Sequence, residues 1–287
     1  MLRILIFALL AALPISVQAQ STVPSNQVQI TLSFAPLVRE AAPAVVNIYA
    51  KRIVQAQARS PFASDPFFQN FFGDLAPSRP QVQNSLGSGV ILSSDGYVVS
   101  NYHVVGEASD IRVVLKDRRE FSAEVVLGDE ASDLAILRLS DARDLPFLAL
   151  RDSNTVEVGE LALAIGNPFG VGQTVSSGII SGLARSGKVT GSARGYFMQT
   201  DAPINPGNSG GALIGMDGSL IGVNTAIVTR SGGSNGIGFA IPAAMVEQFV
   251  RQARAGNDQF MRPWAGMGGQ TVDADLAGSL GLDRSGG

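Results

Sequence analysis

The segment Asn205–Gly211 reads NPGNSGG, a serine held in glycine-rich backbone between two short strand-like stretches at 195–200 and 211–214. Glycines permit sharp turns that bulkier residues resist. Such a turn can aim the backbone N–H groups of Gly207 and Ser209 at one point, which is how an oxyanion hole for acyl transfer is built. A plain surface turn is the simpler interpretation, so the rest of the chain has to decide between the two.

The position of the histidine excludes one class of serine hydrolase. Residues 207–211 also fit the G-x-S-x-G pattern of α/β-hydrolases, in which the catalytic histidine follows the serine. The chain has a single histidine, His103, and it precedes Ser209. A Ser-x-x-Lys dyad is excluded as well, because no lysine has a serine three positions before it.

Two further residues complete a candidate catalytic set. His103 follows a strand-like stretch, and a neutral imidazole can accept the proton of a serine and return it to a leaving amine. Asp133 begins the alternating stretch 134–139, where a carboxylate can hold an imidazole in one tautomer. Taken singly, His103 could be a packed histidine and Asp133 a turn acid, with Asp129 and Glu130 as competitors. The order His, Asp, Ser is that of chymotrypsin-like proteases, and the joint occurrence is far more specific than any one member.

The composition is that of a folded protein without thiol chemistry. Of 287 residues, 45% are hydrophobic and 16% are charged, against roughly 25% charged in an average domain. The formal net charge is −3 and the basic residues form no long run, so the electrostatic footprint of a nucleic-acid-binding protein is missing. Because there is no cysteine and only one histidine, thiol nucleophiles and Cys/His zinc sites are excluded.

Short stretches rich in β-branched residues recur along the chain and are separated by turn residues. The predicted strands are 44–50, 89–92, 97–100, 111–115, 121–127 and 134–139 in a first set, then 161–165, 174–183, 195–200, 211–214, 220–228 and 238–241. A connection rich in Asp, Pro and Asn, 140–159, divides the two sets. Short helices are predicted at 33–40 and 242–255. The pattern therefore predicts an all-β fold of two packed, six-stranded β-barrels.

The first residues predict export. Arg3 precedes an apolar run, and Val17-Gln18-Ala19 places small residues at the two positions that a signal peptidase reads. A membrane anchor is the alternative, but the run falls short of the ~20 residues that a spanning helix needs. We therefore expect a cleaved signal peptide at 1–19, followed by an N-terminal segment at 20–32.

One long segment, 54–85, has no strand pattern and contains Phe67, Phe68, Phe71 and Phe72. On a short helix this spacing would form an apolar face. Loops of such length are usually functional or disordered. The face would either cover the protein's own surface, or cap a site or meet a partner chain.

Several motifs together resemble the HtrA/Deg family of secreted, ATP-independent serine endoproteases. They are GSGV (87–90), NYHVV (101–105), SDLA (132–135), AIGNPFG (164–170), TDAPINPGNSGG (200–211) and GIGFAIP (236–242). The similarity spans about residues 33–255 and implies a chymotrypsin-like double barrel, with a protease domain at 33–257. It also implies that the chain forms a homotrimer and that the loop 54–85 contacts neighbouring subunits.

The resemblance assigns the catalytic roles residue by residue. Ser209 is the implied nucleophile, His103 the general base and acid, and Asp133 the orienting carboxylate. The implied oxyanion hole is the turn Gly207, Asn208 and Ser209, in which the N–H groups of Gly207 and Ser209 face the oxyanion. No cofactor or metal is required for this chemistry.

Substrate binding is assigned by the same resemblance to Ile204, Asn224, Thr225, Ala226, Ile227 and Val228. Ile204 and residues 226–228 are apolar and include no acid, so they imply cleavage after Val, Ala or Ile rather than after Lys or Arg. Residues 224–226 would offer an edge to an extended substrate by β-augmentation. Arg185 resembles a family residue that relays activation between subunits, with a solvated turn arginine as the alternative.

The last residues, 258–287, are expected to be a linker and the start of a PDZ domain, because 264–282 resembles the opening of that module. The implied function is degradation of unfolded or misfolded envelope proteins in the periplasm, as part of quality control under stress. Two alternatives stay open. One is a holdase-like chaperone for the same clients, and the other is a regulatory protease that residues 1–19 keep associated with the membrane.

Overall fold

The structure is a computed structural model, and it describes residues 33–54, 81–167, 172–186, 196–227, 235–262, 266, 272 and 274–282. Side chains at 53–54, 81–83, 184–186, 226–227 and 274 are not included in the description. The expected signal peptide, the segment 20–32 and the four phenylalanines of the long loop lie outside the described residues. The same holds for most of the expected PDZ start, of which a short helix, α6 (Ala274–Leu280), is described.

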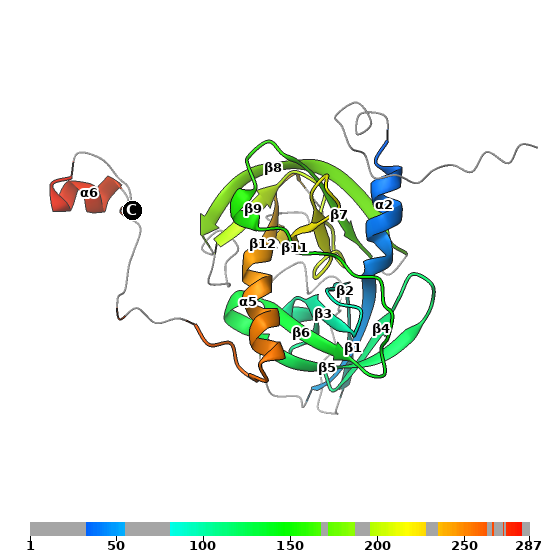
Figure 1. Cartoon of the computed structure of the whole chain (residues 1–287). Coiled ribbons are helices and arrows are strands. Elements are labelled where there is room, and N and C mark those ends of the chain that lie inside the picture. The colour runs from blue at the N-terminus through cyan, green and yellow to red at the C-terminus, as the bar shows by residue number, and fades with distance from the viewer. Residues whose placement is uncertain are drawn as a thin grey trace, which may run out of the picture.

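Twelve antiparallel strands form two closed barrels, as the sequence predicts (Figure 1). The first barrel has the strand order β1-β2-β3-β6-β5-β4, and the second β10-β11-β12-β9-β8-β7. Numbered from its own first strand, the second barrel has the same order as the first. The strands are β1 (Val45–Val54), β2 (Gln81–Ile91), β3 (Tyr97–Ser100), β4 (Asp110–Val114), β5 (Glu120–Asp129), β6 (Leu134–Leu139), β7 (Leu161–Gly166), β8 (Thr174–Ser186), β9 (Tyr196–Thr200), β10 (Ala212–Ile214), β11 (Leu220–Ile227) and β12 (Gly238–Pro242).

Strand β2 begins earlier than the sequence pattern indicates. Residues 81–88 read QVQNSLGS, a polar and glycine-containing stretch without strand character. They pair nonetheless with β1 in an unbroken register from Val54↔Gln81 to Val45↔Val90. Strand pairing overrides weak β-propensity here, so the connection between β1 and β2 is 55–80 rather than 54–85.

Short helices frame the barrels. Helix α2 (Ala35–Ala41) has proline in its first turn, which suits a position whose N–H needs no partner. Helix α5 (Ala243–Arg254) begins after Pro242 and is followed by Gly256 in the left-handed region at φ 82°, the usual end signal of a helix. The remaining described helical turns are η1 (Ala42–Ala44), α4 (Tyr102–Val105), η3 (Glu130–Ser132) and η4 (Ser153–Thr155).

A continuous apolar layer joins the two barrels. Each barrel has its own core, but the largest cluster of buried side chains draws on both barrels and on both framing helices. Helix α5 crosses this seam and packs against β5 and β6 on one side and β11 and β12 on the other (Figure 1). The cluster's largest fully buried members are Leu37, Leu127, Leu134, Ile136, Leu163, Ile165, Phe239 and Phe249.

The packing of this domain continues past residue 257. Phe260 stacks on Phe249 of α5, with ring centroids 4.0 Å apart and planes 15° apart. The Gln252 side chain accepts from the N–H of Met261 at 2.8 Å and donates to its carbonyl at 3.0 Å. Gln259 forms an isolated bridge with Gly128 at the end of β5. Residues 259–262, the docked segment, therefore lie against the barrels rather than beginning a free linker.

Replacing Phe249 with alanine should lower the free energy of unfolding by about 3–5 kcal/mol, because the ring is fully buried where both barrels and the docked segment meet. Phe147→Ala is the matched control, since that ring is 54% exposed, and its effect should stay within about 0.5 kcal/mol. Chemical denaturation of the two variants measures both values. Equal losses would contradict the central role of Phe249.

Candidate active site

His103 and Asp133 form a hydrogen-bonded pair in the first barrel. Nδ1 of His103 lies 2.9 Å from both carboxylate oxygens of Asp133, and the backbone N–H of His103 donates to Oδ1 at 3.0 Å. Their side chains are only 16% and 15% exposed. Burial by itself lowers the pKa of His103, but the charge and the hydrogen bond of Asp133 outweigh it, so this pKa lies above its ordinary value. The pair is thus suited to hold one imidazole tautomer and to stabilise the imidazolium.

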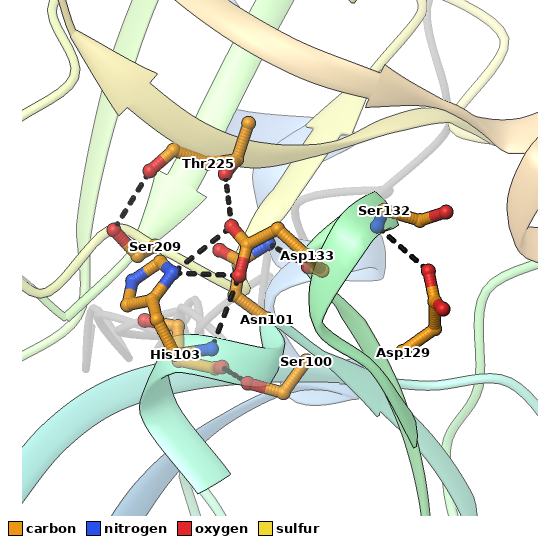
Figure 2. A network of polar contacts seen from close by, with 9 residues as sticks. Ser100, Asn101, His103, Asp129, Ser132, Asp133, Ser209 and Thr225 are labelled. Atoms are coloured by element: carbon orange, nitrogen blue, oxygen red, sulfur yellow. Dashed lines mark hydrogen bonds and ion pairs between the residues drawn. The ribbon is translucent and has the colours of Figure 1, made fainter. Parts of the chain in front are cut away.

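Asp133 is held at the end of a single helical turn. It caps η3 in the left-handed region, at φ 52° and ψ 38°, a conformation that aspartate tolerates better than most residues. Its carbonyl accepts from Nδ2 of Asn101 at 3.0 Å. At the other end of η3, the carboxylate of Asp129 accepts from the N–H of Ser132 at 2.7 Å. Both ends of the turn are therefore fixed by side chains (Figure 2).

The docked segment contacts this turn although it lies 133 positions later in the sequence. Arg262 forms an ion pair and hydrogen bonds with the carboxylate of Asp129, and it donates to the hydroxyl of Ser132 at 2.8 Å. Burial by itself raises the pKa of Asp129, but the hydrogen bonds from Arg262 and Ser132 offset it, so that this pKa is lowered. A residue beyond the predicted protease domain thus supports the loop that carries Asp133.

Ser209 lies in a tight turn of the second barrel. The N–H of Asn208 donates to the carbonyl of Asn205 at 3.0 Å, which closes a four-residue turn with Gly207 at φ 91°. That positive φ is the conformation that a type II turn requires at its third position. Among the described residues, no acceptor is bonded to the N–H of Gly207 or Ser209. These two donors are the ones that the sequence analysis assigns to the oxyanion hole, whereas the N–H of Asn208 is used by the turn itself.

Thr225 connects the two halves of the site. The pairing of β11 with β12 shifts register between Asn224 and Ala226, so Thr225 is the extra residue of a bulge. Its hydroxyl donates to Oδ2 of Asp133 at 2.5 Å, and its carbonyl accepts from the hydroxyl of Ser209 at 3.1 Å. Figure 2 shows the His103 ring between the side chains of Asp133 and Ser209. The three predicted catalytic residues are therefore gathered at the seam, from both barrels.

The predicted substrate-binding and regulatory residues are only partly described by the structure, and Ile204 and Asn224 among them are buried. Ile204 is 2% exposed and packs so closely on Gly238 that a Cβ at that glycine would lie 2.8 Å from its Cδ1. The N–H and the carbonyl of Asn224 are bonded to Gly211 and Gly210. The prediction that Asn224 offers a backbone edge to substrate therefore fails, because this edge is already paired within the protein. The side chains of Arg185, Ala226 and Ile227, and all of Val228, are outside the described residues.

Sequence reasoning missed two supports of the site. Asn101 lies two residues before the histidine within the NYHVV motif, and that position was its only signal. Thr225 was predicted to contact substrate, but its bond to Asp133 depends on a bulge and spans 92 positions of the sequence. No pattern in one chain predicts such a contact.

No group of three or more His, Cys, Asp or Glu side chains in the part of the chain that the structure describes is placed to hold a metal ion. No helix in the same residues has the length and apolar character needed to cross a membrane.

Comparisons with known proteins place this geometry in a family. Residues 87–223, which include His103, Asp133 and Ser209, match the trypsin-like peptidase domain. The chain is 41% identical over 279 residues to the periplasmic pH-dependent serine endoprotease DegQ of Escherichia coli K12, and the match covers 96% of this chain and 58% of DegQ. It is 40% identical over 297 residues to the periplasmic serine endoprotease DegP of the same strain, covering 96% and 62%. The chain thus spans about three fifths of these relatives.

Solved structures agree. The HtrA-type protease AlgW with decapeptide superposes with a TM-score of 0.69 at 45% identity, over 89% of this chain and 77% of that one. The serine endoprotease from Yersinia pestis matches with a TM-score of 0.57 at 38% identity, over 77% and 66%. Fold and site together define a chymotrypsin-like serine protease domain. Within that class, the chain belongs to the HtrA/Deg family.

Arg262→Gln should lower the free energy of unfolding at pH 7 by at most about 1 kcal/mol, because the arginine is partly exposed and its ion pair is screened. Because the pKa of Asp129 is lowered in the folded state, its carboxylate stabilises the fold at pH values above the ordinary pKa of 3.8. This stabilisation is lost as the pH falls through the folded-state pKa. The difference between wild type and variant should therefore shrink below about pH 4. Denaturation at several pH values measures it.

The control for this prediction is Lys51→Gln, which removes an exposed ion pair with Asp110 between β1 and β4 and has no contact with Asp129 among the described ion pairs. Its effect should stay within about 0.5 kcal/mol. A loss for Arg262→Gln that does not change with pH would show that the Asp129 carboxylate is not what the arginine stabilises.

Proposed function

We propose that this chain is a serine endopeptidase in which Ser209 attacks the peptide carbonyl. In the first step, Oγ of Ser209 bonds to the carbonyl carbon, its proton passes to His103, and the carbonyl oxygen becomes an oxyanion near the N–H groups of Gly207 and Ser209. The tetrahedral intermediate collapses when His103 protonates the leaving amine, which leaves an acyl ester on Ser209. Water then repeats the sequence and frees the new carboxyl group.

The observation that carries this proposal is the Asp133–His103 pair next to Ser209, with Thr225 bonded to both the carboxylate and the serine. Asp133 fixes the tautomer that leaves the other ring nitrogen of His103 as the proton acceptor. The hydroxyl of Ser209 points to the carbonyl of Thr225 in this structure, so it has to rotate toward His103 for the attack. The family of the chain supports the same chemistry.

We place the activity in the periplasm, on unfolded polypeptides. The names of DegQ and DegP support that location, and the apolar start of the chain fits export. AlgW was solved with a decapeptide, which supports an extended chain as the substrate. Cleavage after small aliphatic residues remains part of the proposal through the resemblance and the apolar character of Ile204 and residues 226–228. A homotrimer remains part of the proposal through the resemblance alone.

The first test is digestion of reduced, denatured casein by the purified chain, with the products mapped by mass spectrometry. We expect cuts after Val, Ala or Ile, and a loss of at least about 10³-fold in rate for Ser209→Ala, because a triad without its nucleophile keeps little activity. The control is Ser176→Ala, which removes an exposed hydroxyl whose bond within the described part of the chain goes to the carbonyl of Pro203. It should digest casein like the wild type.

Three results would speak against the proposal. Equal digestion by wild type and Ser209→Ala would exclude Ser209 as the nucleophile. Equal inactivity of both, with aggregation of a denatured client still suppressed, would favour the holdase-like alternative. Cuts after Lys or Arg would overturn the assigned specificity while leaving the mechanism in place.

Asp133→Asn should change both the rate and its pH dependence. Without the carboxylate, the imidazole loses its tautomer control, and kcat/KM should fall on the order of 10³- to 10⁴-fold. Since Asp133 raises the pKa of His103, its removal lowers that pKa, and the acid limb of the residual kcat/KM profile should move to lower pH. Asp110→Asn, at an exposed ion pair, should leave the profile in place. An acid limb that stays put or moves to higher pH would contradict the role of Asp133.

A further inference from the structure

Ser88 lies on β2 of the first barrel, yet its backbone N–H and its hydroxyl are bonded to the second. Its backbone N–H donates to the carbonyl of Ser209 at 2.8 Å. Its hydroxyl donates to the carbonyl of Gly207 at 2.7 Å and accepts from the N–H of Asn167 at 2.9 Å. Its own carbonyl accepts from the hydroxyl of Ser100 at 2.8 Å. The residue is fully buried, so these contacts are made without competition from solvent.

The direction of the hydroxyl proton follows from the chemistry of its partners. A backbone N–H can only donate and a carbonyl can only accept. Because Asn167 supplies an N–H, the proton of the Ser88 hydroxyl has to point at the carbonyl of Gly207. One side chain therefore links the end of β7 to the turn that precedes the nucleophile.

The flanking glycines make this contact possible. A Cβ at Gly87 would lie 2.7 Å from Cγ1 of Val104, and a Cβ at Gly89 would lie 2.8 Å from Cδ1 of Ile48. On the opposite side, a Cβ at Gly210 would lie 2.1 Å from the carbonyl oxygen of Ser88. A side chain at 210 would therefore hold the turn away from β2, and side chains at 87 or 89 would displace β2 from its packing on Val104 and Ile48.

Each carbonyl that Ser88 holds belongs to a residue that carries an oxyanion donor. Gly207 carries one N–H of the expected oxyanion hole and Ser209 the other. The bonds to the two carbonyls fix the peptide planes 207–208 and 209–210, and each of these planes is joined to a donor through a single Cα. Gly207 is at φ 91°, where glycine has broad conformational freedom. Hydrogen bonds from β2 to its carbonyls therefore add to the turn's own bond from Asn208 to Asn205 in restricting that freedom.

We propose that Ser88 is a positioning residue for the oxyanion hole, acting through the carbonyls of Gly207 and Ser209. The inference rests on the proposed function, and it adds a residue from the first barrel to a hole whose donors come from the second. Preorganised donors contribute to catalysis because they need no rearrangement when charge develops on the oxygen. Loss of the Ser88 hydroxyl should therefore weaken binding of the transition state and leave binding of the substrate nearly unchanged.

The test compares Ser88→Ala with Ser100→Ala in the full chain, on a chromogenic peptide with valine before the scissile bond. Ser100 is the matched control because it is also a fully buried serine of the first barrel, and its hydroxyl bonds to Ser88 rather than to the turn. For Ser88→Ala we expect kcat to fall about 10- to 100-fold with KM within about twofold of wild type. For Ser100→Ala we expect kcat within about threefold.

A second readout separates positioning from loss of structure. A peptide aldehyde with valine at the same position forms a tetrahedral adduct on Ser209 whose oxygen occupies the oxyanion hole. Its inhibition constant should rise for Ser88→Ala by the same factor as kcat/KM falls. The inhibition constant of the matching product peptide, which forms no such adduct, should not change. Thermal unfolding of each variant shows whether it is folded at the assay temperature.

Three results would overturn the role of Ser88 as a positioning residue. Equal loss of kcat in Ser88→Ala and Ser100→Ala, a rise in KM alone, or unchanged aldehyde inhibition would overturn the inference. If Ser88→Ala does not fold, Ser88→Cys replaces it, since a thiol is a weaker donor of similar shape, and its kcat should fall at unchanged KM. If the wild type shows no turnover, or if its turnover is unchanged in Ser209→Ala, the proposed function is wrong and this inference fails with it.

Discussion

The close approach of β2 to the turn of Ser209 is the contact on which the rest of the site depends. His103 and Asp133 belong to the first barrel, whereas Ser209 and Thr225 belong to the second. Neither barrel alone assembles the site. A shared apolar layer holds the barrels together from within, and backbone atoms at the seam meet directly, because glycines stand where any side chain would intervene. The catalytic residues must be positioned to within tenths of an ångström, and they lie at a junction between the two barrels. Side chains and backbone pack at this junction as closely as in a protein core.

Buried polar groups complete that junction. Each hydrogen bond across the seam contributes only about 0.5–1.5 kcal/mol, but a buried partner left unsatisfied costs more, so the network penalises any relative shift of the barrels. The bulge at Thr225 gives one residue two functions: its hydroxyl faces one barrel's acid and its carbonyl faces the other barrel's serine. Register errors in β11 would separate these two contacts, which links strand pairing directly to the geometry of the site.

The sequence predicted the architecture better than the connections across it. Alternating β-branched stretches identified all twelve strands, eleven of them within a few residues, because strand pattern is local. Residues 81–88 were missed, since their strand character comes from pairing with β1 rather than from their own side chains. His103, Asp133 and Ser209 were found through their order along the chain. Thr225 and Ser88 could not be assigned their contacts in this way, because one depends on a bulge and the other on the approach of two barrels. The packing of residues 259–262 was hidden for a similar reason, as Phe260 and Arg262 have partners more than ten positions away.

The docked segment also sets the geometry of whatever the chain carries after it. If residues 256–262 were free, they would add up to about 23 Å of reach to a tether that starts at the end of α5. Their stacking on Phe249 and their ion pair with Asp129 remove that slack. Residue 262 is therefore fixed beside the loop that carries Asp133. A tether measured from this point is shorter by that length, and it starts at the catalytic loop rather than at the end of α5.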